Sequence, residues 1–326
     1  MEMKRVSFGW LRAAVTLAAC LAVPVAFGQG YPAKPIRVVI GFPAGTTGDV
    51  AARIIAPQLS EGLGQQLVID NRPGAGSSLA AEAVAHAAPD GYTLLLSTIA
   101  NAINPALYTL NFDFGRDLVP VSLLTEAPAL LVAHPAVPVQ SLRDLVKLAK
   151  SKPGEIMYGS SGTGTVTHLY GEMFNLGEGV KLGHVPYKGS SQAITDLLGG
   201  RIGLLFSPAS TVIPHVKAGS LKALGVIGRQ RLVALPLVPT FAQQGVSGFD
   251  SALWFGLNAP TGTPTAVISR LNHELARVLA LPQVKSQLEA QDIVPLPVGS
   301  DRFGLFITSE TEKWKRVVQG AGVKLE

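Results

Sequence analysis

Short apolar runs rich in Val, Ile and Leu alternate along the chain with longer stretches whose apolar residues recur at helical spacing. The run 36–40 predicts a strand, and in the stretch 49–61 the side chains of Val50, Ile54 and Leu59 share one helical face. Further strands are predicted at 67–69, 93–97, 156–159, 183–186, 202–206, 223–227 and 254–258, and further helices at 77–87, 141–150, 165–175, 190–198, 212–218, 264–280, 282–290 and 300–319. This alternation is typical of βαβ units built on a parallel sheet, so the pattern predicts the α/β class.

The predicted elements form two similar βα blocks followed by a tail of helices. Two long connections, 119–134 and 249–260, flank the second block and have the composition of extended segments. If the tail packs on the first block, the chain crosses between two domains twice, and the two crossing strands form a hinge. We therefore predict a first domain made of residues 29–128 and 255–326 and a second domain made of residues 129–254.

The first 28 residues have the pattern of a secretory signal peptide. Lys4, Arg5 and Arg12 precede the apolar run 13–26, and small residues stand before a cleavage point after Gly28. The run is shorter than the roughly 20 residues that a membrane span needs, so a permanent anchor is the weaker interpretation. A lipoprotein cleavage site at Cys20 is a second alternative, although the apolar run continues past that cysteine. We expect a protein exported to the periplasm.

Composition narrows the function further. The 326 residues carry a formal charge of +5, which becomes +3 once the leader is removed, and the basic residues are spread along the chain. Binding of nucleic acid through a basic tract is therefore disfavoured. The single cysteine excludes an internal disulfide framework and a thiolate-rich metal site, and the six histidines are scattered without metal-ligand spacing, so we expect no metal and no cofactor.

A loop rich in glycine and threonine follows the first predicted strand. In an open α/β sheet, ligands bind beyond the carboxyl ends of the strands, and the amides at a helix start attract anions. The alternative is an ordinary capped turn with the aspartate as helix cap. The candidate ligand residues of this loop are Phe42, Ala44, Gly45, Thr46, Thr47 and Asp49.

A second loop of the same kind, 158–168, follows the strand of the second block. It lacks the lysine of a phosphate-binding loop, the full dinucleotide fingerprint and the G-x-S-x-G elbow of a hydrolase. What remains is a bed of amides and hydroxyls suited to a carboxylate, with His168 either near the ligand or simply bonded to backbone. The candidate ligand residues here are Ser160, Ser161, Gly162, Thr163, Gly164, Thr165 and His168.

Several segments together resemble the Bug family, the periplasmic solute-binding components of tripartite tricarboxylate transporters. The similar segments are 42–53, 71–76, 89–94, 104–108, 158–174, 185–189, 235–240 and 259–264, in the family's order along nearly the whole mature chain. The resemblance implies a two-lobed Venus-flytrap fold that closes around a small, usually carboxylated solute. It also implies delivery to a membrane permease of two subunits, although many members have no obvious permease of their own.

The resemblance further implies that both loops grip the ligand and that Phe206 and Ser207 add pocket wall. Three positions depart from the family pattern: Thr46 stands where a second glycine is usual, Ser77 where a further glycine is often found, and Ser207 where aspartate is frequent. The missing acid would weaken recognition of an ammonium group, which disfavours an amino acid ligand.

The leading hypothesis is a monomeric binding protein that captures a small carboxylate by hinge closure and is not an enzyme. One alternative is an exported serine-type hydrolase that uses Ser160 or Ser161 with His168. Another is a sensor subunit that binds the same solute and reports it to a signalling receptor.

Overall fold

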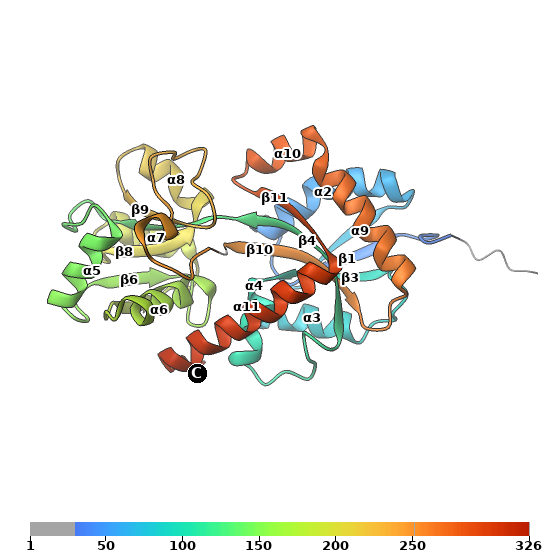
Figure 1. Cartoon of the computed structure of the whole chain (residues 1–326), viewed down its shortest axis with the longest axis horizontal. Helices are drawn as coiled ribbons and strands as arrows, with labels where there is room; N and C mark the ends of the chain where they lie inside the picture. The colour runs from blue at the N-terminus through green and yellow to red at the C-terminus, as the bar shows by residue number, and fades with distance from the viewer. Residues whose placement is uncertain (1–29, 251, 326) are drawn as a thin grey trace, which may run out of the picture. The chain divides into compact units, whose positions relative to one another are not determined.

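The computed structural model describes residues 30–250 and 252–325, whose strands form two β-sheets (Figure 1). The first sheet has the strand order β11-β4-β10-β3-β1-β2 and the second β7-β6-β8-β5-β9. We use "first lobe" and "second lobe" for each sheet with its helices. The predicted leader at residues 1–28, with Cys20, lies outside the described residues. In the described part of the chain, no helix has the length and apolar character to span a membrane.

The first sheet combines strands from both ends of the chain. Its strands are Ile36–Ile40 (β1), Leu67–Asn71 (β2), Thr93–Thr98 (β3), Leu118–Ala127 (β4), Leu253–Pro260 (β10) and Val294–Gly299 (β11). β1 pairs in parallel with β2 and β3. β10 lies antiparallel between β3 and β4, and β11 pairs antiparallel with β4 at the sheet edge. The predicted parallel pairing is therefore wrong for β4, β10 and β11, because the long connections form β4 and β10, which pair antiparallel, and a strand from the carboxyl-terminal part adds β11 antiparallel at the edge.

The second sheet is built from one continuous part of the chain. Its strands are Ala129–Ala133 (β5), Met157–Ser160 (β6), Gly183–Pro186 (β7), Leu204–Pro208 (β8) and Lys222–Ile227 (β9). β6 is parallel to β7 and β8, whereas β5 is antiparallel to β8 and β9. The connection predicted at 119–134 contains two strands, β4 in the first sheet and β5 in the second. The second sheet is mixed because β5 pairs antiparallel with its neighbours.

Helices follow the strands largely where the periodicity predicts them. The first lobe has Thr47–Leu63 (α2), Ser78–Ala85 (α3), Ile99–Ile103 (α4), Thr265–Ala280 (α9), Pro282–Glu289 (α10) and Ser300–Ala321 (α11), with 3₁₀ turns Ala75–Ser77 (η1) and Asn104–Ala106 (η2). The second lobe has Leu142–Ser151 (α5), Val166–Glu178 (α6), Ser190–Leu198 (α7) and Ala209–Lys217 (α8), and the 3₁₀ turn Ala242–Gln244 (η3) precedes β10. The sequence pattern misses α4, whose five residues are too few to show a helical period.

The chain passes between the lobes twice, and α11 adds a third connection. Only Pro128 separates β4 of the first sheet from β5 of the second, and the chain returns to the first sheet through β10. α11 packs on β4 and α4 of the first lobe and on α6 of the second. Its Trp314 contacts the ring of Tyr170 edge-on at a centroid distance of 5.8 Å.

A buried polar contact fixes α11 against β10. The carboxylate of Glu310 is 4% exposed and accepts the indole N–H groups of Trp254 and Trp314, each at 3.1 Å. The ammonium of Lys313 also donates to it. Because a buried charge needs such partners, this cluster stabilises the packing of α11 against β10.

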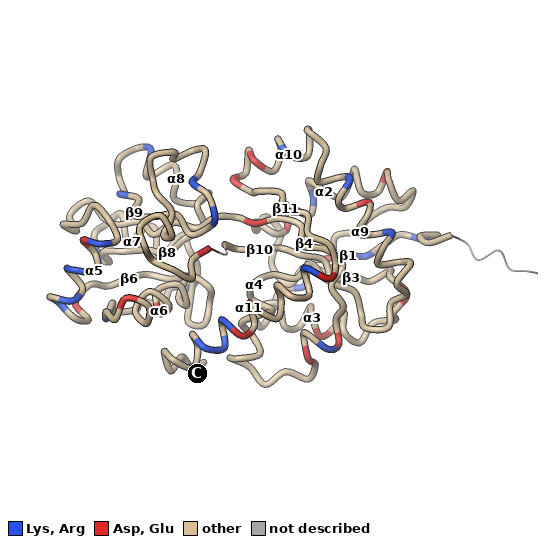
Figure 2. The backbone as a smooth tube through the Cα atoms, in the orientation of Figure 1, with Lys and Arg blue, Asp and Glu red and all other residues tan. Residues whose placement is uncertain are grey.

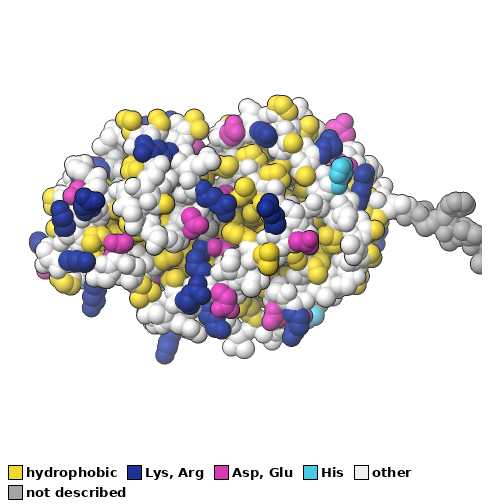
Figure 3. Space-filling view, viewed as in Figure 1, with side chains coloured by type: hydrophobic (Ala, Val, Ile, Leu, Met, Phe, Trp, Pro, Cys, Tyr) yellow, Lys and Arg dark blue, Asp and Glu magenta, His cyan; other side chains and the backbone are white. Residues whose placement is uncertain are grey.

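Charged residues concentrate on helices and loops, and most of the strand backbone carries none (Figure 2). On the face drawn in Figure 3, Lys and Arg side chains are spread over both lobes with Asp and Glu side chains between them. The diffuse charge that the sequence predicts is therefore seen on this surface.

Candidate functional site

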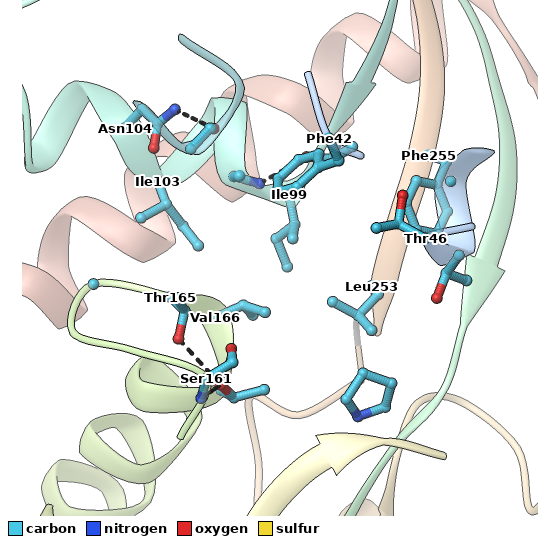
Figure 4. Close-up of a pocket in the computed structure, with 18 of the residues that line it drawn as sticks. Phe42, Thr46, Ile99, Ile103, Asn104, Ser161, Thr165, Val166, Leu253 and Phe255 are labelled. Atoms are coloured by element: carbon cyan, nitrogen blue, oxygen red, sulfur yellow. Dashed lines mark hydrogen bonds between the residues drawn. The ribbon is translucent and has the colours of Figure 1, made fainter. Parts of the chain in front are cut away.

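A cleft of about 420 Å³ is lined by residues from both lobes (Figure 4). The first lobe contributes the β1–α2 loop, the start of α2, α4 and the beginning of β10. The second lobe contributes the β6–α6 loop, the start of α6, the first residue of α7 and the last residue of β8. The cleft therefore lies where the two predicted ligand loops meet.

The buried side chain of Asp49 holds the β1–α2 loop through hydrogen bonds. Its side chain is 2% exposed and accepts the Gly45 amide at 2.9 Å, the Arg53 Nε at 2.9 Å and the Asn71 side-chain amide at 3.0 Å. Burial alone would raise the pKa of this carboxyl, but the hydrogen bonds from Arg53, Gly45 and Asn71 outweigh it and hold the pKa below its usual range. Asp49 thus acts as an anchor for the loop.

A corresponding network holds the β6–α6 loop. The Ser161 amide donates to Thr167 Oγ1 at 3.0 Å, and the Thr165 hydroxyl donates to the Gly162 carbonyl at 2.7 Å. One turn into the helix, the Nδ1 of His168 accepts the Gly164 amide at 3.0 Å. An imidazole that accepts here is unprotonated at this nitrogen, so His168 supports the loop as a neutral side chain.

Two stacked histidines lie beneath this loop. The rings of His168 and His184 are 3.8 Å apart with an interplanar angle of 14°, and the Nε2 of His184 is 2.7 Å from the Ser160 hydroxyl. Burial lowers the pKa of His168, and burial together with the neighbouring imidazole lowers the pKa of His184 to about 4. Both rings are therefore neutral near pH 7.

The starts of α2 and α6 present free backbone amides at the cleft. The amide of Val50 donates to the carbonyl of Thr46, and the amide of Leu169 donates to that of Thr165, as the first bonds of these helices. The three preceding amides of each helix therefore have no acceptor within it. Thr47 and Gly48 of α2 and Val166 of α6 line the cleft. Each helix start carries a partial positive charge of roughly 0.5. Among the described residues that line the cleft, none has a charged side chain, so the amides are the main attraction for an anion.

Seven of the predicted ligand residues line the cleft and eight do not. Those in the lining are Phe42, Thr46, Thr47, Ser161, Thr163, Gly164 and Thr165. Those outside it are Ala44, Gly45, Asp49, Ser160, Gly162, His168, Phe206 and Ser207. Most of the second group hold the loops by hydrogen bonds, as described above. Phe206 instead packs on Tyr158 with ring centroids 5.7 Å apart, and Ser207 is fully buried with its hydroxyl 2.9 Å from that of Thr211.

Sequence reasoning missed the apolar wall of the cleft. Ile99, Ile103 and Asn104 come from α4 and the turn after it, and Leu253 and Phe255 come from β10. One signal for α4 was present in the sequence, because Thr98 is followed three residues later by the polar Asn101, a spacing that marks a helix start. In the structure, the hydroxyl of that threonine caps the helix.

The serines do not form the pair that the hydrolase alternative requires. The hydroxyl of Ser161 contacts Thr167 Oγ1 at 2.9 Å, and that of Ser160 contacts His184. Ser160 is fully buried and outside the cleft lining. His168 has its Nδ1 occupied by the loop amide. In residues 30–250 and 252–325, no three His, Cys, Asp or Glu side chains gather as a metal site would need.

A two-lobed α/β fold with an amide-lined cleft between its lobes defines a solute-binding protein. The model of the family "Tripartite tricarboxylate transporter family receptor" matches residues 51–323. The chain belongs to this family, which confirms the resemblance found in the sequence. Protein BugT of Bordetella pertussis is 36% identical over 309 residues, which cover 94% of each chain.

Solved structures agree over nearly the whole chain. A structure described as a periplasmic transporter has a TM-score of 0.77 at 35% identity and covers 91% of this chain and 100% of its own. An R. palustris protein solved with adipate has a TM-score of 0.77 at 34% identity, with coverages of 90% and 100%. MatC of Rhodopseudomonas palustris, solved with malate, has a TM-score of 0.73 at 30% identity, with coverages of 88% and 100%. The two-lobed fold predicted from the sequence is confirmed.

Proposed function

We propose that this solute-binding receptor captures a small carboxylate-bearing solute in the cleft, by movement of the two lobes about their crossing strands, and passes it to a membrane permease. The observation that carries the proposal is the pair of helix starts, one from each lobe, whose free amides meet in one cleft. The carboxylates adipate and malate in the two related structures support the same solute class.

Binding, and not catalysis, is the proposed activity. Neither candidate serine contacts His168, and one of them is buried. Calorimetry of the purified protein with a panel of carboxylates should give saturable binding at one site without turnover. Ester hydrolysis that disappears in Ser161→Ala would contradict the proposal, and so would the absence of binding by every carboxylate.

The cleft lining described above is the proposed contact set, and Thr47→Val with Thr163→Val tests it. Both variants remove a hydroxyl at the cleft while keeping the side-chain shape. Each should weaken binding about three- to tenfold, since a hydrogen bond is worth roughly 0.5–1.5 kcal/mol. Thr308→Val on the exposed face of α11 is the matched control and should leave binding unchanged.

We further propose a periplasmic location, with residues 1–28 removed as a signal peptide. The periplasmic relative and the leader pattern support this. Amino-terminal sequencing of the protein from a periplasmic extract should begin at Gln29. A chain that begins at a lipid-modified Cys20 would contradict cleavage at that point.

The proposed domain bounds remain 29–128 with 255–326, and 129–254. The distribution of strands between the two sheets supports them. We also propose that the receptor works as a monomer with a permease of two subunits. Light scattering of the solute-bound protein should give the mass of one chain, and a stable dimer would contradict the monomer.

A further inference from the structure

We infer that the solute is a carboxylic acid without an amino group whose remaining atoms form an apolar alkyl or aryl body. This inference rests on the proposed function, since it concerns the class of solute held in the same cleft. The observations behind it are the apolar wall and the absence of charged side chains among the described residues of the lining.

Apolar side chains form part of the cleft lining, and the rest of the lining carries neutral hydroxyl and amide groups. Figure 4 shows the side chains of Ile99, Val166 and Leu253 pointing into one space, with Phe42 and Phe255 farther along it. These residues come from both lobes, so a solute held between the lobes meets apolar surface from more than one direction. Such surface favours methylene or aromatic carbon, which gains by leaving water. Hydroxyl or further carboxylate groups placed against it would lose their water without a partner.

The polar groups of the cleft suit an anion and not a cation. Helix-start amides donate hydrogen bonds and carry partial positive charge, so they attract a carboxylate and repel an ammonium. The aspartate nearest in sequence to these amides, Asp49, has both oxygens occupied by donors from its own lobe. No acidic side chain therefore stands in the described lining to receive an amino group, so an ammonium bound there would find neutral hydroxyl and amide oxygens but no opposite charge to offset its desolvation.

A matched set of solutes tests the inference on the mature protein. 4-Methylpentanoate and leucine share one carbon skeleton and differ by the amino group, whereas citrate offers carboxylates and a hydroxyl with little apolar body. Isothermal titration at pH 7 should give an affinity for 4-methylpentanoate about a hundredfold higher than for leucine or citrate, the ratio expected for an unpaired charged group on burial.

One substitution can supply the missing acid. Ser190 lines the cleft at the first position of α7, where a carboxylate is compatible with the helix. Ser190→Asp should reduce the preference for 4-methylpentanoate over leucine at least about tenfold. Ser191→Asp adds the same charge at the next position, which is exposed and outside the lining, and should leave the preference unchanged.

The possible results distinguish the class of solute from the binding function itself. Tighter binding of leucine or citrate than of 4-methylpentanoate would overturn the inference while the proposed function stands. An unchanged preference in Ser190→Asp would also overturn it, because the missing acid would then not exclude the amine. If none of the three solutes binds, and no carboxylate of the wider panel does, the proposed function fails as well.

Discussion

The substitution Asp49→Asn tests how the first ligand loop is held. The change keeps the size of the side chain but removes its charge and turns one acceptor into a donor. One oxygen can still accept from Gly45 and Arg53, while the new amide group faces the side-chain amide of Asn71, which is itself a donor. One hydrogen bond is therefore lost, the bond from Gly45 becomes a neutral one, and the bond from Arg53 keeps only the charge of its donor.

The magnitude follows from these three bonds. Hydrogen bonds to a charged group contribute roughly 1.5–3 kcal/mol each and neutral ones about 1 kcal/mol, so the loss of one bond and the weakening of the Gly45 bond should lower the free energy of unfolding by about 2–5 kcal/mol. The share of the ion pair itself is small, because the Arg53 side chain is 52% exposed and screened by water. Because Gly45 belongs to the loop at the cleft, solute affinity should also fall about tenfold.

Urea unfolding followed by circular dichroism measures the first effect and calorimetry the second. Asp90→Asn is the control, because Asp90 forms an exposed pair with Lys34 at 3.4 Å and should change stability by less than about 0.5 kcal/mol. Equal midpoints for the two variants would refute the reasoning.

The pH dependence adds a check on sign. Since the folded pKa of Asp49 is lowered, its contribution is present above the ordinary value of 3.8 and is lost as the pH falls through the folded value. The wild-type and Asp49→Asn stabilities should therefore converge below about pH 3.8. Curves that stay parallel in this range would show that the charge is not the cause.

Three further predictions concern the packing around the cleft. Gly171→Ala should lower the free energy of unfolding in urea by about 1–3 kcal/mol, because its new Cβ would lie 2.2 Å from ring atoms of the buried Tyr158. The control is Gly177→Ala on the same helix, whose Cβ meets nothing within 4 Å and which should be neutral or stabilising. Equal effects of the two substitutions would refute this. Burial lowers the pKa of His184 to about 4, so its contribution to the free energy of unfolding is present above the unfolded value of 6.5 and is lost as the pH falls toward 4, a decrease of roughly 2–3 kcal/mol. His184→Phe should therefore flatten the dependence of stability on pH between these values. An unchanged slope would contradict this. Trp314→Phe removes one donor to the buried glutamate of α11 and replaces the fully buried indole with a smaller phenyl ring, so thermal unfolding should show a loss of about 2–4 kcal/mol. No loss would mean that Trp314 does not hold the helix in place.

The alternation of apolar runs was enough to predict most elements near the site. It predicted β1, α2, β6 and α6, because each is long enough to show its period and is bounded by glycine or a polar residue. β11 was missed because it contains Pro295 and Pro297, which remove backbone donors. The structure accommodates both prolines because β11 is an edge strand.

The site was predictable only in part for a related reason. Glycine and threonine at a helix start indicate a loop that can contact a ligand, so Thr47 and Thr163 were predicted from the sequence. Leu253 and Phe255 lie on one face of β10, but every residue of this strand after Leu253 is buried, and a strand pattern does not indicate which of its faces meets a cleft. Their role depends on the position of β10 relative to the second lobe, which no local pattern encodes.

The place of β10 in the first sheet also constrains the order in which the protein can fold. Leu253–Pro260 lies between β3 and β4, so these two strands lack their shared partner until the last quarter of the chain has been made. The second sheet uses only residues 129–227 and can form as soon as they have emerged. We therefore expect the lobe encoded in the middle of the gene to fold first, with the amino-terminal strands waiting, incomplete and aggregation-prone, for the carboxyl-terminal ones.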